Sequence, residues 1–127
     1  MKSVQRVINY KGKEYKAVFN LNVMQDIQEK YGTLEAWGDL TEGKRVNQET
    51  GEEESVEVDI AALIFGYALM LNEGIEIDNE DNGTDNPPLT LRQVGRMISE
   101  AGERETAEAM NDLVIASVGK TEEEKNG

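Results

Sequence analysis

The stretch that decides the fold is residues 59–74, DIAALIFGYALMLNEG. Asp59 is a favourable helix N-cap, and the residues after it are apolar around almost the whole circumference of a helix. A helix without a polar face has to be covered on all sides, so the rest of the chain is expected to pack around it. Gly74 is expected to end this helix, which would then be roughly 20 Å long and too short to cross a bilayer.

Residues 3–21, at the start of the chain, are predicted to form a β-hairpin. Two runs rich in β-branched and aromatic residues flank a short turn centred on Gly12. In the second run, apolar side chains alternate with polar ones, which is the pattern of a strand covered on one face. Because a lone hairpin is marginally stable in water, that face is expected to pack on helices. The covered face would hold Tyr15, Ala17, Phe19 and Leu21.

Helix caps and apolar spacing predict three further helical segments around the central one. Asn22 is the expected N-cap of the segment over residues 22–40, which Gly32 interrupts. Thr90 with Gln93 forms a capping box for the segment over residues 90–101. The four helical segments span residues 22–40, 59–73, 90–101 and 103–118. In the third, the inner face would hold Leu91, Val94, Ile98 and Ala101. The predicted fold is a mainly helical α+β single domain, residues 1–119, with the hairpin packed on about four helices.

Three polar segments are expected to lie outside the core. Residues 41–58 hold six glutamates and only isolated valines, so they predict either a mobile insert or a loose hairpin turning at Thr50-Gly51. Residues 75–88 are predicted to form an acidic loop that ends in two prolines. Residues 120–127 (KTEEEKNG) are expected to be a disordered tail.

The composition excludes several classes of function. The chain has 13 Lys and Arg against 26 Asp and Glu, a formal net charge of −13, and contains neither His nor Cys. The acidity disfavours a basic nucleic-acid-binding surface, and the missing residue types remove thiolate nucleophiles, imidazole bases and zinc or iron-sulfur ligands. Carboxylate or Ser/Lys catalysis, cation binding through oxygen ligands and the binding of another protein remain possible, while no cofactor and no nucleic-acid or membrane partner is expected. No secretion signal precedes the domain, so a cytoplasmic location is expected.

The charge is distributed unevenly along the chain. Residues 1–31 hold six Lys or Arg and three acidic residues, whereas the remainder is strongly acidic. Lys11, Lys13 and Lys16 on the hairpin are therefore candidates for head-to-tail self-association with the acidic part of a second copy. The alternative is an acidic domain whose first hairpin happens to be rich in lysine.

Two other functions are suggested by the acidic clusters. Asp78, Glu80, Asn82 and Gly83 resemble the start of an EF-hand calcium loop, although Leu89 stands where the bidentate Glu of the twelfth position belongs. A calcium-responsive binding module is thus one alternative. The other is an acidic DNA mimic that inhibits a nucleic-acid-binding protein, supported by the glutamates at 52–54 and the acids of 76–85 but weakened by their expected place in loops.

The succession of elements resembles the tail assembly chaperones of long-tailed (siphovirus-type) bacteriophages and prophages. The residues that carry the resemblance are the strand-to-helix passage from Phe19 to Trp37, the apolar helix from Asp59 to Gly74, and the helix entry at 89–91. The resemblance covers most of the chain and consists of hydrophobic spacing and caps rather than a chemical motif.

The resemblance implies a non-enzymatic protein that binds the long, helical tape measure protein and the tail tube protein before tail assembly. Such a protein acts in the host cytoplasm and is absent from the finished virion. The family offers no catalytic or metal-binding residues to transfer. The large apolar side chains expected to form either the core or the partner-binding surface are Trp37, Ile64, Phe65, Tyr67, Met70, Met97 and Met110.

Overall fold

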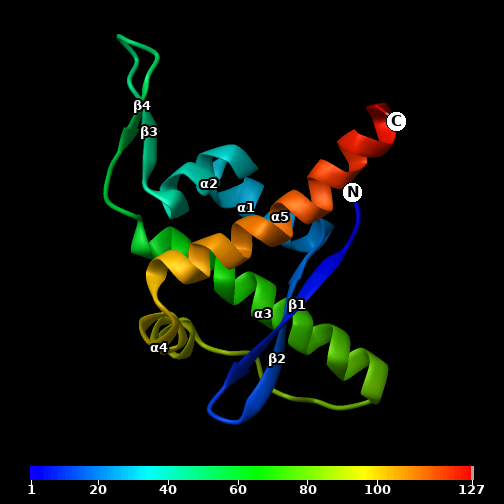
Figure 1. Ribbon diagram of the computed structural model, residues 1–127. Helices are drawn as coiled ribbons and strands as arrows, with labels where there is room; N and C mark the ends of the chain where they lie inside the picture. The colour runs from blue at the N-terminus through cyan, green and yellow to red at the C-terminus, as the bar shows by residue number, and fades with distance from the viewer. Residues whose placement is uncertain (127) are drawn as a thin grey trace.

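The computed structural model describes the backbone of residues 1–126 and the side chains of residues 1–119 (Figure 1). Two antiparallel hairpins and five helices make up this described part, which forms one α+β domain as predicted. The elements in chain order are β1 Val4–Tyr10, β2 Lys13–Phe19, α1 Leu21–Tyr31, α2 Leu34–Glu42, β3 Lys44–Val46, β4 Glu53–Ser55, α3 Ile60–Asn82, α4 Leu91–Ala101 and α5 Glu103–Asn126.

The N-terminal hairpin closes through a tight two-residue turn. Lys11 and Gly12 both have positive φ, 50° and 75°, as a type I′ turn requires, and Tyr10 pairs directly with Lys13 across it. The twist of such a turn matches that of the strands it joins. The sequence signal of a glycine between two β-branched and aromatic runs thus corresponds to a real hairpin.

The junction between β2 and α1 differs from the prediction. Asn20, not Asn22, is the N-cap, because its side-chain oxygen accepts hydrogen bonds from the backbone N–H groups of Asn22 and Val23. Leu21 is consequently the first residue of α1 and is 66% exposed, so its expected place on the covered strand face is wrong. The fully buried end of β2 is formed by Ala17, Val18 and Phe19.

The central helix is α3, and it is longer than predicted. It runs from Ile60 to Asn82 across the middle of the domain, in contact with β2 and with every other helix (Figure 1). At 1.5 Å per residue it is about 34 Å long. Its length and composition are sufficient to span a membrane, so the prediction that it is too short to do so is wrong. However, half of its most apolar 18-residue stretch is buried within the domain. That burial is characteristic of a core helix.

Gly74 serves close packing rather than helix termination. A Cβ atom at this position would collide with the carbonyl oxygen of Lys16 in β2, so the missing side chain lets α3 lie directly on the strand. The neighbouring Glu73 is buried, and its Oε2 accepts hydrogen bonds from the side-chain amides of Asn20 at 2.6 Å and Asn22 at 2.9 Å. The middle of α3 is thereby fixed to the junction of β2 and α1.

The segment between α3 and α4 is held against α3 by two asparagines one heptad apart. Asn72 Oδ1 accepts from the backbone N–H of Leu89 at 2.7 Å, while its Nδ2 donates to the Leu89 carbonyl at 3.1 Å. Asn79 makes the same pair of bonds with the backbone of Asn86, both at 3.0 Å. The expected loop over 75–88 is therefore wrong for its first half, because α3 continues to its C-cap, Gly83.

Of the two alternatives predicted for residues 41–58, the structure contains the hairpin. Three-residue strands β3 and β4 pair in register, and the turn between them includes Gly51 at a φ of 73°. The first residues of the predicted insert instead complete α2, which ends at Glu42. The hairpin stands away from the body of the domain in Figure 1.

The last helix, α5, continues past its predicted end. It was expected to stop before Gly119, but its backbone is helical to Asn126, since a single interior glycine costs only about 1 kcal/mol relative to alanine. The backbone of 120–126, which was expected to be a disordered tail, is thus assigned to α5, and Gly127 lies outside the described residues. Ser117 of α5 donates a hydrogen bond to the carbonyl of Lys2, which ties the helix to the N-terminus.

Candidate functional site

Five of the seven large side chains predicted for the core or the partner surface belong to the core. All five are almost completely buried, and they are Trp37, Tyr67, Met70, Met97 and Met110. Trp37 illustrates why: its Nε1 donates a hydrogen bond to the carbonyl oxygen of Ala62 at 3.0 Å. Its ring also fills the space above Gly66, where a Cβ atom would collide with the indole. These residues hold α2, α3, α4 and α5 together, and their own side chains are too buried to contact a partner.

Phe65 is partly buried on the side of α3 that faces α1. Its ring meets Tyr31 edge to face, with a centroid separation of 5.7 Å and an interplanar angle of 71°. The ammonium group of Lys30 lies 4.4 Å from the centre of the Phe65 ring, so a cation–π contact covers its outer face. Phe65 is thereby engaged within the domain, and burial raises the pKa of the adjacent Tyr31 phenol.

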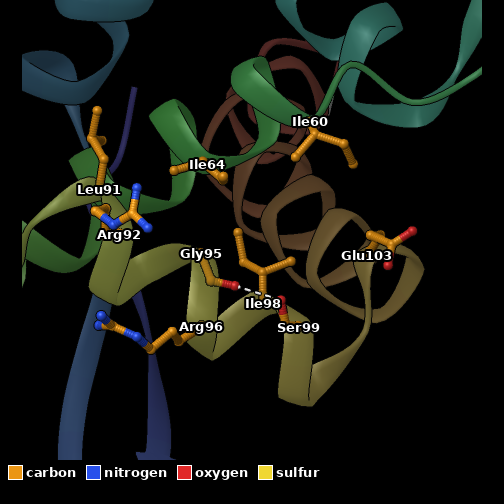
Figure 2. A pocket seen from close by; sticks show the side chains of 9 residues that line it. All are labelled: Ile60, Ile64, Leu91, Arg92, Gly95, Arg96, Ile98, Ser99 and Glu103. Atoms are coloured by element: carbon orange, nitrogen blue, oxygen red, sulfur yellow. Dashed lines mark hydrogen bonds between the residues drawn. The ribbon is translucent and has the colours of Figure 1, made fainter.

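Ile64, the remaining predicted residue, lines an open apolar groove between the start of α3 and the length of α4. The groove has a volume of about 460 Å³. Figure 2 shows the lining side chains of both helices, with Glu103 at the start of α5 beside one end of the groove. The apolar lining consists of Ile60, Ile64, Leu91 and Ile98.

Two helix caps place these apolar groups at the surface. Asp59 accepts a hydrogen bond from the N–H of Ala62, which makes Ile60 the first residue of α3. Thr90 forms the predicted capping box with Gln93, which makes Leu91 the first residue of α4. Leu91 is 58% exposed and Ile60 is 46% exposed, so neither is covered by the domain.

The floor of the groove is open because α4 carries a glycine there. A Cβ atom added to Gly95 would lie 3.6 Å from Cδ1 of Ile64, which is ordinary van der Waals contact, so this glycine is not required for packing. Ser99, one turn later, donates its hydroxyl back to the Gly95 carbonyl at 2.9 Å (Figure 2). Small side chains at both positions leave the apolar groups accessible.

The rim of the groove carries charges of opposite sign at its two ends. Arg92 and Arg96 are exposed at one end, four residues apart on α4 and therefore on the same face. Figure 2 shows Glu103 at the other end. In the part of the chain whose side chains are described, neither arginine forms an ion pair with a carboxylate.

Sequence reasoning missed most of this site. Leu91 and Ala101 were expected on the inner face of α4, but both are exposed, and only Val94 and Ile98 of that set are buried. The hydrophobic period of α4 indicates an apolar stripe without indicating how far its neighbours cover it. The sequence feature that could have indicated this site is the pair of arginines beside the apolar first residue of α4.

The hairpin lysines differ in their surroundings. Lys16 forms an ion pair with Asp78 of α3 at 2.9 Å, and this hydrogen bond and the charge of Asp78 raise the pKa of Lys16. Lys11 and Lys13 are exposed, each beside a tyrosine ring of its own hairpin. Only these two of the three predicted self-association residues retain an ammonium group without a carboxylate partner among the described side chains.

The predicted likeness to a calcium loop is not matched by the geometry. Asp78, Glu80 and Asn82 lie on the last turns of α3 instead of in a loop, and a helix directs successive side chains to different sides. An EF-hand gathers its ligands by winding a loop around the ion. Among the residues with described side chains, no three acidic groups are close enough to hold a metal ion.

Comparison of the chain with models of protein families, with curated protein sequences and with solved structures finds no match in any of the three.

Proposed function

We propose that this chain is a non-enzymatic tail assembly chaperone that binds tape measure and tail tube proteins in the host cytoplasm before a phage tail forms. The proposal joins the resemblance of the sequence to one structural observation, the groove between α3 and α4. An apolar groove between two helices is a common site for the apolar face of a third helix. The tape measure protein of such phages is long and helical, so it offers many segments of this type.

The distribution of charge supports the proposal. A holding chaperone has to expose apolar surface and yet remain soluble together with an unassembled partner. The chain has a net charge of −13, while the exposed apolar groups of Ile60 and Leu91 lie together at the groove. Repulsion between acidic domains would keep several copies apart on one long partner.

One structural observation favours the DNA-mimic alternative, and another weakens it. Four acids expected in a loop, Glu76, Asp78, Glu80 and Asp81, lie on a helix, which suits a mimic of a phosphate backbone. However, Lys16 pairs with Asp78, and the other hairpin lysines lie on the same small sheet, so positive charge interrupts the acidic row. The chaperone function is therefore preferred to the DNA mimic.

Coexpression with the tape measure protein from the same genome tests the proposal. The expected result is a soluble complex that survives pull-down. Leu91→Asp should weaken the complex, because it places a charge in the apolar groove. Ile115→Asp is the matched control: Ile115 is 55% exposed on α5, close to the value for Leu91, but lies outside the groove.

Two outcomes would count against this function. The absence of any complex between the wild-type chain and the tape measure protein would overturn it. Equal loss of the complex in both variants would show that binding does not use the groove. Gene order is a further check, since a tail tube gene upstream and a very long tape measure gene downstream are expected.

A further inference from the structure

The groove between α3 and α4 is lined by positive charge on α4 and by negative charge at the start of α5, an arrangement that the proposed function does not require. Arg92 and Arg96, which have no carboxylate partner among the described side chains, line it from the first turn and the middle of α4, and Glu103 lies past the end of α4, at the start of α5 (Figure 2). Between Arg96 and Glu103, α4 contributes Ile98 and Ser99 to the lining, and Ile60 and Ile64 of α3 lie opposite them. A partner with apolar groups alone would leave both arginines without a counter-charge.

The spacing of these charges defines what fits between them. From the midpoint of the two arginines to Ala101, the last residue of α4, is about seven residues, or roughly 10 Å at the helical rise, and Glu103 follows two residues later, past the break at Gly102. A helix that lies along α4 would therefore meet the two ends with side chains about nine residues apart. Between them, apolar residues at helical spacing would contact Ile60, Ile64 and Ile98, and an apolar residue beyond the carboxylates would contact Leu91.

We propose that the groove binds an amphipathic helix that carries carboxylates at one end of its apolar stripe and a basic residue at the other. The carboxylates pair with Arg92 and Arg96, and the basic residue pairs with Glu103. The proposal rests on the groove being the partner surface of the proposed function, and it adds the chemistry and orientation of the bound segment. Charge complementarity of this kind fixes the register of a helix in a groove.

Two synthetic helical peptides test the proposal with the whole chain. Both carry the same apolar stripe and one lysine; the first has two glutamates about nine residues from the lysine, and the second has lysines in their place. Non-specific attraction to a chain of net charge −13 would favour the second peptide. The proposal predicts the opposite, a preference for the glutamate peptide of about fivefold at low salt, as expected of two exposed ion pairs.

A pair of double variants identifies the residues responsible. Arg92→Glu with Arg96→Glu should reverse the preference, so that the lysine peptide binds more tightly. Lys11→Glu with Lys13→Glu changes the net charge equally, at exposed positions on the hairpin, and should leave the preference unchanged. All four side chains are exposed, so both variants are expected to keep the circular dichroism spectrum of the parent chain.

Several results would overturn the proposal. These are a preference of the parent chain for the lysine peptide, equal binding of both peptides, no binding of either, or a reversal caused by the hairpin variant. None of these depends on a phage protein, so they are separate from the pull-down with the tape measure protein. A complex in the pull-down with no peptide preference would retain the function and reject this occupant.

Discussion

Gly74 of α3 lies against the backbone carbonyl oxygen of Lys16 in β2, at a distance that leaves no room for a Cβ atom. This contact brings the axis of the central helix onto the hairpin. It also explains why a glycine is retained in the middle of a long helix, where glycine is otherwise unfavourable by about 1 kcal/mol relative to alanine.

Gly74→Ala is expected to destabilise the domain. The added methyl group would push α3 away from β2, at a cost of about 1–3 kcal/mol in the free energy of unfolding, beyond what the better helix former returns. Gly38→Ala in α2 is the control, because nothing lies within 4 Å of a Cβ atom there, and it should be neutral or stabilising. Urea unfolding followed by circular dichroism measures both. Equal stability of the two variants would contradict the packing argument.

Trp37→Phe is expected to lower stability by about 1–3 kcal/mol, because it removes the hydrogen bond to Ala62 and leaves a cavity beside Gly66. Leu21→Ala, at an exposed position, should change stability by less than about 0.5 kcal/mol. Thermal unfolding of both variants measures the difference. A Trp37→Phe variant with unchanged stability but weakened binding to the tape measure protein would instead place Trp37 at the partner surface.

Asn72→Ala is expected to release the segment that leads into α4. The substitution removes both side-chain bonds to the backbone of Leu89, with an expected loss of about 1–3 kcal/mol. Hydrogen exchange at the Leu89 amide should become faster. In the exposed control Asn86→Ala, the lost side-chain contact with Asn79 is long, at 3.4 Å, so exchange at Leu89 should be unchanged.

Stability is expected to fall at alkaline pH partly through Tyr67. Burial raises the pKa of its phenol above the ordinary value of 10.0, although the charge of Arg6 opposes the shift. The folded state therefore holds this proton more tightly than the unfolded state does. The linked stability is fully present below the unfolded-state pKa and is lost as the pH rises through the raised folded-state pKa.

Tyr67→Phe should accordingly shift the midpoint of alkaline unfolding to higher pH. The measurement is circular dichroism during a base titration, with phenolate absorbance recorded in parallel. Tyr10→Phe on the hairpin removes a phenol that is not in the core and serves as the control. An identical midpoint in both variants would show that Tyr67 does not limit stability in base.

Self-association through the basic hairpin remains a prediction, now centred on Lys11 and Lys13 because Lys16 pairs with Asp78. Sedimentation at low salt should detect dimers or larger species that dissociate at high salt, where the Debye length is short. Lys11→Glu with Lys13→Glu should abolish them. A chain that is monomeric at all salt concentrations would support the alternative of a hairpin that happens to be rich in lysine.

Much of the fold follows from local patterns in the sequence. The turn at Gly12, the caps at Asp59 and Thr90, and the all-round apolar character of the helix after Asp59 each predict an element that the structure contains. Local hydrogen bonds and periodicity are sufficient for these predictions, because a cap or a tight turn involves residues only a few positions apart.

Helix ends marked only by glycine were predicted less well. Gly74 and Gly119 were expected to end helices, and both lie inside them. Glycine has the same local preferences wherever it stands, so the sequence does not distinguish a C-cap from a position of close packing. Gly74 is kept helical by its contact with β2, a strand far from it in sequence.

The sequence alone determined the order of the hairpin and helices, the acidity of the chain and the apolar character of its central helix, because these depend on residue type and spacing. Only the tertiary structure decided which apolar groups remain uncovered. Trp37 and four other predicted residues became core, whereas Leu91 and Ile60 stayed exposed beside Arg92 and Arg96. Burial depends on where neighbouring elements end in space, and the hydrophobic pattern of a single helix carries no information about that.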